Sequence, residues 1–183
     1  MTAHTGSGNP VGTASTPPRA LWVTVLVVGV VVDQLTKVWA VAALEDRPPV
    51  PILPTLEFDL HYNGGFSFGT GQGAGRWIAL VVVGLSLYLL RLIVVETSTV
   101  RLLLFTFILS GALGNLFDRV LRAEDGFLTG DVVDFIDVSW FAIFNVADIL
   151  VVGGVTAFAL FELVGPGRSK RAEPGRLTVD DGQ

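Results

Sequence analysis

Residues 111 to 148 read GALGNLFDRVLRAEDGFLTGDVVDFIDVSWFAIFNVAD and join the ends of two very hydrophobic segments. Amide and ionisable side chains stand in this stretch beside apolar runs long enough to lie in lipid. They are Asn115, Asp118, Arg119, Asp134, Asn145 and Asp148. A charged group at the centre of a bilayer costs about 2.5 to 3.5 kcal/mol, so such groups are rarely kept there without a use. The stretch therefore predicts a polar site at a membrane face.

The composition of the whole chain indicates an integral membrane protein. Of its 183 residues, 51% are hydrophobic and only 16% are charged, and the mean hydropathy is +0.62. A soluble domain of this length does not need so much apolar surface for its core. The chain has no cysteine, which excludes disulfides, thiolate metal sites and a cysteine nucleophile.

Four apolar segments are long enough to cross a hydrocarbon core about 30 Å thick at about 1.5 Å per residue. We expect transmembrane helices at residues 20–44, 76–95, 100–120 and 140–164. A cleaved signal peptide is the competing interpretation of the first segment. The apolar run is too long for such a peptide, and little positive charge precedes it, so we favour a retained helix.

The chain is expected to divide into one membrane domain between two tails. These parts are a disordered N-terminal tail at 1–18, a four-helix domain at 19–166 and a polar C-terminal tail at 167–183. Four spans place both termini on one side of the membrane. Arg19, Arg91, Arg101 and the basic residues of the C-terminal tail fall on that side, so the positive-inside rule makes it cytoplasmic. The loops at 45–75 and 121–139 then face outward.

The segment from 45 to 75 breaks the hydrophobic pattern. Its four prolines forbid a continuing helix, and Leu56 to Tyr62 alternates apolar and polar residues as a half-buried strand does. We expect a small β element on the membrane surface, with a short amphipathic helix around Phe66 to Gly71. His61 has no second ligand nearby in the sequence, so we expect a surface residue there and not a metal ligand.

Asp33 and Lys37 lie four residues apart, late in the first expected span. Residues at this spacing share one face of a helix, so the two side chains can neutralise each other or meet partners on other helices. A structural ion pair and a role in the polar site are both compatible with the pattern.

Two aspartates offer the chemistry of a hydrolase. Asp134 lies just before the fourth span and Asp148 is expected about two turns inside it, with a connecting chain short enough to let their carboxylates meet. Two carboxylates held close in a poorly solvated place cannot both ionise easily, so one keeps a proton while the other stays a base. Such a dyad can activate water and protonate a leaving amine without a metal or cofactor. Asn115 and Asn145 can orient the acids, and Arg119 can bind a substrate carbonyl.

Other interpretations of these residues remain open. Interhelical hydrogen bonds in membranes average about 0.6 kcal/mol, and the polar groups could serve only to tie helices together. The spacing of Asp131, Asp134 and Asp137 allows a divalent-ion site of a membrane lipid transferase, for which Asp118 is the best further ligand. A transporter or channel subunit would use the same buried charges as an ion path, although the chain has no internal repeat.

Five blocks of the sequence resemble, in order, the signature blocks of lipoprotein signal peptidase, also called signal peptidase II. They are Asp33-Gln34-Leu35-Thr36-Lys37, Tyr62-Asn63-Gly64-Gly65-Phe66-Ser67-Phe68, Gly111-Ala112-Leu113-Gly114-Asn115-Leu116-Phe117-Asp118-Arg119, Val132-Val133-Asp134-Phe135 and Phe144-Asn145-Val146-Ala147-Asp148. Each block lies at the appropriate end of an expected helix. The resemblance covers about residues 20 to 165 and leaves both tails uncovered.

The resemblance implies an aspartic endopeptidase of the bacterial inner membrane, which removes the signal peptide from prolipoproteins before the diacylglyceryl-modified cysteine. It implies no cofactor and no metal. Its catalytic aspartates fall on Asp134 and Asp148, and its substrate-contacting residues on Asn63 and Arg119. The supporting polar residues fall on Asp33, Lys37, Asn115, Asp118 and Asn145.

The family fold is an all-α membrane protein with a small extracytoplasmic β-cradle and a short surface helix between the first two spans. The implied partners are prolipoproteins, membrane lipids and inhibitors of the globomycin type, with no nucleic acid. Here the segment from Asp118 to Asp134 is longer than is common in the family, with residues 122–130 as a hydrophilic insert.

Overall fold

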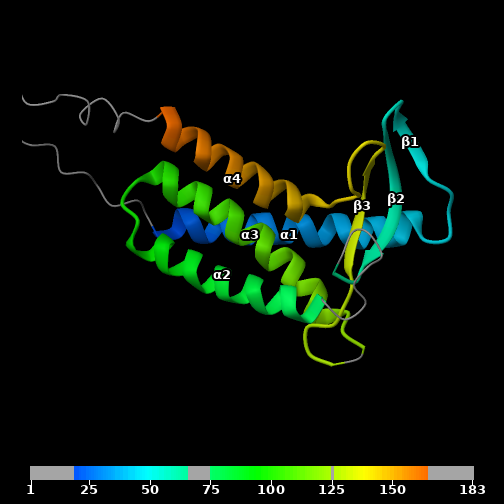
Figure 1. Cartoon of the computed structure of the whole chain (residues 1–183), viewed down its shortest axis with the longest axis horizontal. Helices are drawn as coiled ribbons and strands as arrows, with labels where there is room; N and C mark the ends of the chain where they lie inside the picture. The colour runs from blue at the N-terminus through cyan, green and yellow to red at the C-terminus, as the bar shows by residue number, and fades with distance from the viewer. Residues whose placement is uncertain (1–18, 66–74, 125, 165–183) are drawn as a thin grey trace, which may run out of the picture.

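The computed structural model describes residues 19–65, 75–124 and 126–164. Four long helices lie side by side, and a small antiparallel sheet covers one end of the bundle (Figure 1). This arrangement confirms the expected fold class. The short helix expected around Phe66 to Gly71 and the two expected tails lie outside the described residues.

The helices are α1 (Arg19–Leu44), α2 (Gly75–Val95), α3 (Thr99–Leu121) and α4 (Val146–Val164). Each is long and apolar enough to cross a membrane. The first three begin and end within one residue of the bounds expected from hydropathy. The fourth begins at Val146 and not at Trp140, because the backbone of Phe144 exchanges hydrogen bonds with Ile136 of the sheet and so cannot be helical.

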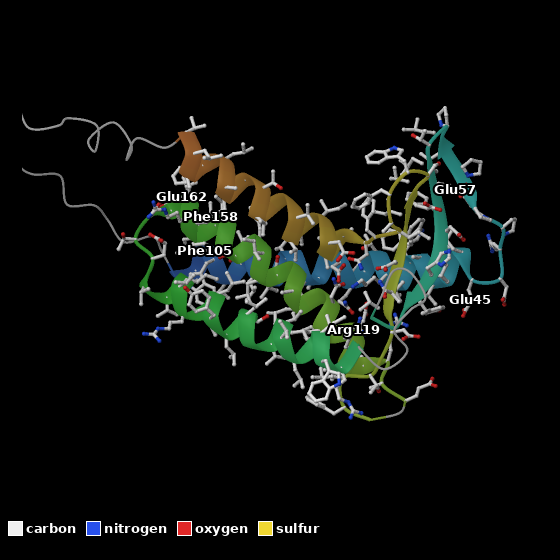
Figure 2. The ribbon with its side chains drawn as sticks, viewed as in Figure 1. Glu45, Glu57, Phe105, Arg119, Phe158 and Glu162 are labelled. Carbon is white, nitrogen blue, oxygen red and sulfur yellow. The ribbon has the colours of Figure 1, made fainter. Side chains whose placement is uncertain are left out.

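Helix α3 lies at the centre of the bundle and contacts the other three helices. Small residues allow its closest approaches: a Cβ on Gly111 would collide with the backbone oxygen of Ala147 in α4, and one on Gly154 would meet Ile108 at 2.7 Å. Small residues of this kind let helix backbones pack tightly within lipid. Further from the sheet, Phe105 of α3 faces Phe158 of α4 with ring centroids 5.1 Å apart (Figure 2).

The sheet contains β1 (Val50–Leu53), β2 (Leu56–Asn63) and β3 (Val132–Val138), in the order β1-β2-β3. The strand expected at 56–62 is confirmed as β2. Pro51 lies in β1, at the edge of the sheet, where its missing N–H breaks no ladder of hydrogen bonds.

The expectation of an outer loop over 121–139 was wrong for residues 132–138. They form β3, whose first four residues are all buried. Asp134 and Asp137 interrupt the segment at a spacing of three, so it shows neither a strict alternation nor a continuous apolar run, and periodicity does not identify it.

Contacts with α1 fix the position of β3. Val133 and Phe135 pack with Ala40 and Leu44 in one buried cluster. Trp39 adds an edge-to-face contact to Phe135, with ring centroids 6.0 Å apart. Successive side chains of a strand point to opposite faces. Asp134, between Val133 and Phe135, is therefore directed away from this cluster.

Candidate active site

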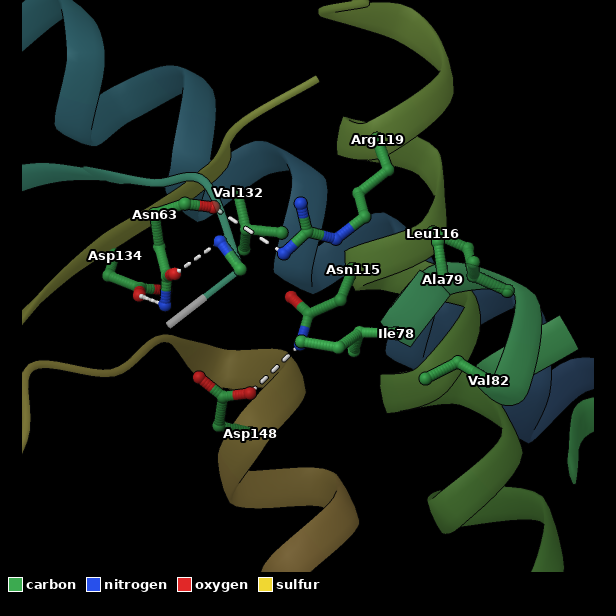
Figure 3. Close-up of a pocket in the computed structure, with 11 residues that line it drawn as sticks. Asn63, Ile78, Ala79, Val82, Asn115, Leu116, Arg119, Val132, Asp134 and Asp148 are labelled. Carbon is green, nitrogen blue, oxygen red and sulfur yellow. Dashed lines mark hydrogen bonds between the residues drawn. The ribbon is translucent and has the colours of Figure 1, made fainter. Parts of the chain in front are cut away.

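A cavity of about 200 Å³ lies where the sheet meets the ends of α2, α3 and α4 (Figure 3). One part of its wall is polar and the other is apolar. The polar part comprises Asn63, Asn115, Arg119, Asp134 and Asp148, and the apolar part comprises Ile78, Ala79, Val82, Leu116 and Val132. The fold thus brings the two expected catalytic aspartates to one cavity, from β3 and from α4.

Asn145 joins the two aspartates. Its Nδ2 donates to Oδ1 of Asp134 at 2.6 Å, and its backbone N donates to Oδ2 of Asp148 at 3.2 Å. The side chain of Asn145 is fully buried. One residue therefore sets the relative position of both carboxyl groups.

Asp148 belongs to the cap of α4. Asn145 is the residue before the helix, and its Oδ1 accepts from the backbone N of Asp148 at 3.0 Å while Asp148 returns the bond to the backbone of Asn145. This reciprocal pattern is a capping box. The position expected for Asp148, about two turns inside the helix, was therefore wrong: it lies in the first turn. Its other oxygen, Oδ1, accepts from Nδ2 of Asn115 at 2.8 Å.

Asp134 is 4% exposed. Besides the bond from Asn145, its Oδ2 accepts from Nδ2 of Asn63 at 2.9 Å. Burial raises the pKa of Asp134 to about 6, and the charge of Asp148 also raises it, against the lowering effect of the bonds from Asn63 and Asn145. Asp134 can therefore hold or release a proton close to neutral pH.

Lys37 is buried completely and uses its three N–H donors on three oxygens. Nζ lies 2.9 Å from Oδ2 of Asp33, 2.8 Å from Oδ2 of Asp118 and 2.9 Å from Oδ1 of Asn115. Because the ammonium only donates, it fixes the orientation of the Asn115 amide, whose Nδ2 then faces Asp148. The Asp33–Lys37 pair is thus both an ion pair and part of the site.

The two acids beside Lys37 hold the backbone next to each aspartate of the cavity. Asp33 Oδ1 accepts from the backbone N of Ala147, the residue before Asp148, at 2.8 Å. Asp118 Oδ2 accepts from the backbone N of Val133, the residue before Asp134, at 3.2 Å. A single buried cluster of Asp33, Lys37 and Asp118, called here the lysine cluster, therefore positions both sides of the site.

Arg119 lines the cavity and reaches toward the sheet. Its Nη1 donates to the carbonyl of Gly130 at 3.0 Å. Its Nη2 donates to the carbonyl of Asn63 at 3.5 Å, as Figure 3 shows. The guanidinium is therefore held between the backbones that lead into β3 and out of β2.

The other acidic residues of the 131–137 segment do not join the site. Asp137 lies three residues after Asp134 on β3, so it projects to the opposite face. Asp131 precedes the strand and lines a separate pocket with Tyr62 and Arg122. Within the described residues, no three His, Cys, Asp or Glu side chains are grouped so that they could hold a metal ion. His61 is exposed and contacts Asp59 at 2.8 Å, as expected for a surface residue.

Two features of the site were missed at the level of sequence. The apolar wall from Ile78, Ala79 and Val82 gave no signal, because such residues look the same whether they face lipid or a cavity. The start of α4 did leave a signal in the sequence, since an Asn followed three residues later by an acidic residue is a helix-cap pattern.

Comparisons with known proteins agree with one another. The family model for signal peptidase (SPase) II matches residues 25–164. A lipoprotein signal peptidase of Bifidobacterium adolescentis is 40% identical over 166 residues, covering 88% of this chain and 88% of that protein. One of Mycobacterium avium is 37% identical over 171 residues, covering 87% and 92%. A bacterial membrane enzyme solved in meso at 1.9 Å resolution is similar in structure, with a TM-score of 0.71 at 25% identity over 84% of this chain and 99% of that one.

Proposed function

This chain belongs to the signal peptidase II family, and from that premise we propose that it removes the signal peptide from prolipoproteins by means of an aspartate dyad and water. The proposed dyad is Asp134 and Asp148. The observation that carries it is their convergence on one cavity, with Asn145 hydrogen-bonded to both. The proposed cleavage point is the peptide bond before the diacylglyceryl-modified cysteine.

In the proposed reaction the dyad holds one proton between its two carboxyl groups. The ionised carboxylate takes a proton from water as the water oxygen attacks the scissile carbonyl carbon. The protonated carboxyl then donates its proton to the amide nitrogen, and the C–N bond breaks. The products are a carboxylate on the signal peptide and a free amine on the lipidated cysteine. A pKa of about 6 for Asp134 supports a proton shared near neutral pH.

We assign orientation of the substrate to Arg119 and Asn63. The guanidinium of Arg119 supplies a fixed positive charge in the cavity wall, suited to the oxygen that gains negative charge as water attacks. Asn63 holds Asp134 through Nδ2, and its Oδ1 accepts from the backbone N of Gly65 at 3.0 Å, which fixes the amide orientation. We assign a positioning role to the remaining polar residues of the site, which are Lys37, Asp33, Asp118, Asn115 and Asn145.

The location of the cavity suits a substrate that is partly in lipid. Its apolar wall comes from α2 and α3, whereas the dyad lies at the sheet end of the bundle. Arg91 and Arg101 lie toward the opposite ends of these helices. By the positive-inside rule they support a sheet outside the cytoplasm and both termini inside it. We propose a multi-pass protein of the bacterial cytoplasmic membrane, with membrane lipids around it and globomycin-type inhibitors competing for the cavity.

The test is a mobility-shift assay with purified protein in detergent, a diacylglyceryl-modified prolipoprotein and excess chelator. Wild type should cleave, and Asp134→Asn should not. Asp137→Asn is the matched control, because it alters the same residue type on the same strand but on the opposite face; it should cleave like wild type. Cleavage by a folded Asp134→Asn variant would rule out the dyad mechanism. Loss of wild-type activity with chelator would point to a metal-dependent enzyme.

A further inference from the structure

Leu128 is a buried leucine that follows two exposed residues, Gly126 and Phe127. It is 2% exposed, whereas its neighbour Phe127 is 72% exposed. Its backbone has a φ of 62°, in the left-handed region that leucine rarely adopts. A residue keeps such a conformation when the surrounding structure determines it. Residues 126–130, called here the Leu128 turn, are therefore held in place by specific contacts.

Leu128 packs against residues that also line the cavity. Leu128 forms one buried cluster with Ala79 of α2 and Leu116 of α3. Both of these residues also line the cavity that contains the two aspartates. The side chain of Leu128 thus anchors the turn to the helices that form the apolar wall.

The same turn holds Arg119. The carbonyl of Gly130 accepts from Nη1 of Arg119 at 3.0 Å, and the backbone N of Gly130 donates to the carbonyl of Arg119 at 3.1 Å. A Cβ on Gly130 would meet backbone atoms of Asp118, Arg122 and Ala123 at 2.6 to 2.8 Å. The hydroxyl of Thr129 closes the turn by donating to the carbonyl of Gly126 at 2.6 Å. The position of the guanidinium therefore depends on where the turn lies.

We propose that Leu128 is a positioning residue for substrate binding, which acts by seating the Leu128 turn so that Gly130 holds the guanidinium of Arg119 in the cavity. This inference rests on the proposed function of Arg119. Loss of the leucine side chain frees the turn, and the guanidinium loses the nearer of its two backbone acceptors, the carbonyl of Gly130. A long flexible side chain that is no longer held binds its substrate less well, because it must be ordered when the substrate binds.

The experiment measures kcat and KM for prolipoprotein cleavage by Leu128→Ala, Leu128→Met and Phe127→Ala, at a temperature where tryptophan fluorescence shows each variant folded. Leu128→Ala should raise KM by up to about tenfold, which is the order of magnitude that ordering one long side chain on binding costs. Leu128→Met should restore KM nearly to the wild-type value, because the volume is conserved. Phe127→Ala, the matched control in the same turn, should behave like wild type.

A double-variant cycle with Arg119→Lys separates positioning from general stability. If Leu128 acts through Arg119, then Leu128→Ala should raise KM much less in the Arg119→Lys background than in wild type. Equal rises in both backgrounds, or a wild-type KM for folded Leu128→Ala, would overturn the inference. Should Leu128→Ala fail to fold, Thr129→Val decides the matter: it loosens the turn without altering the buried cluster, and an unchanged KM would contradict the proposal.

The failure of this inference can be told apart from failure of the proposed function. If wild type does not cleave the prolipoprotein, the proposed function is lost, and the role of Leu128 with it. If wild type cleaves and Arg119→Lys raises KM while Leu128→Ala does not, the function stands and only the role of the Leu128 turn is rejected.

Discussion

The two ends of the helical bundle are held together in different ways. At the sheet end, α1, α3 and α4 meet through the lysine cluster, whose charged groups are buried almost completely. At the other end, Ile93, Phe105 and Leu109 form an apolar cluster with Phe158 packed against it. There the ion pair between Arg101 and Glu162 lies on the surface, with side chains 42% and 40% exposed.

The difference shows what buried charge achieves that apolar packing does not. Apolar side chains hold helices together but tolerate small shifts, because their contacts have no direction. Buried ion pairs add little net stability over apolar packing, since each charge must first lose its water. They do, however, require particular geometry: Asp33 and Asp118 each bond the backbone directly before one of the two aspartates of the cavity. The buried charges at the sheet end fix the positions of groups in the cavity, whereas the apolar contacts at the far end hold the helices together.

The largest expected effect is at the dyad. Asp134→Asn and Asp148→Asn should each lower kcat about 10⁴-fold, and the double variant no further, because the two carboxyl groups act as one unit. Glu162→Gln, at the opposite end of α4, is the matched control and should leave kcat unchanged. Single-turnover cleavage of prolipoprotein measures all four variants. A double variant whose loss equals the product of the two single losses would mean that the aspartates do not share a step.

Next in size is the loss of the ammonium from the lysine cluster. Lys37→Met should lower the free energy of unfolding by about 3 to 5 kcal/mol, because it leaves two buried carboxylates without their cation. Adding Asp33→Asn should recover part of this loss, since it removes one of those charges. Unfolding in mixed detergent micelles, followed by tryptophan fluorescence, gives the values. A loss no greater than that of Arg101→Met would erase the contrast between the two ends.

The pH dependence of activity should report the raised pKa of Asp134. In the proposed mechanism the dyad holds one proton, and with a pKa of about 6 for Asp134 that proton is lost as pH rises. The value of kcat/KM should therefore fall above about pH 6, by about tenfold per pH unit. Asn63 donates to the ionised carboxylate of Asp134 and lowers its pKa. Asn63→Ala should therefore move the fall in kcat/KM to higher pH. A fall that moves to lower pH, or a rate that rises through pH 6, would contradict a protonated Asp134.

The smallest effect is expected at the surface pair of the far end. Arg101→Met should lower the free energy of unfolding by at most about 1 kcal/mol, because exposed ion pairs are screened by water and salt. The difference from wild type should shrink further in about 1 M salt, where the screening length is about 3 Å. Cleavage rates should stay at the wild-type value. A loss of several kcal/mol would show that the far end also depends on directed charge.

Much of the fold followed from hydropathy. Three spans were predicted within one residue, because a lipid core demands a fixed length of apolar helix. The fourth span was predicted too long, since the turn before it contains Trp140, Phe141 and Phe144, and hydropathy cannot distinguish an apolar turn from an apolar helix. The strand β3 was missed for a different reason: Asp134 and Asp137 stand three residues apart, which breaks the alternation that identified β2.

The polar residues that gather at the candidate site could be predicted, but little of their bonding. Asp33, Lys37, Asn115, Asp118 and Asn145 stood out as costly polar groups beside apolar segments. The Asp33–Lys37 pair follows from a spacing of four residues, but the other contacts depend on helix rotation and depth, which no sequence spacing records. The sequence likewise gave no sign that Leu128 would be buried inside a hydrophilic segment, because its seat is formed by α2 and α3 and not by its neighbours in the chain.

The cap of α4 has a consequence for the order in which the protein is made. Asn145 and Asp148 lie at the start of the last of the four helices to leave the ribosome. Until that helix enters the membrane, Asp134 lacks its bond from Asn145, and Asn115 has no carboxylate to hold. If Asp134 and Asp148 act as proposed, the nascent chain cannot cleave prolipoprotein until α4 is inserted, so activity begins only after the other three helices are in place.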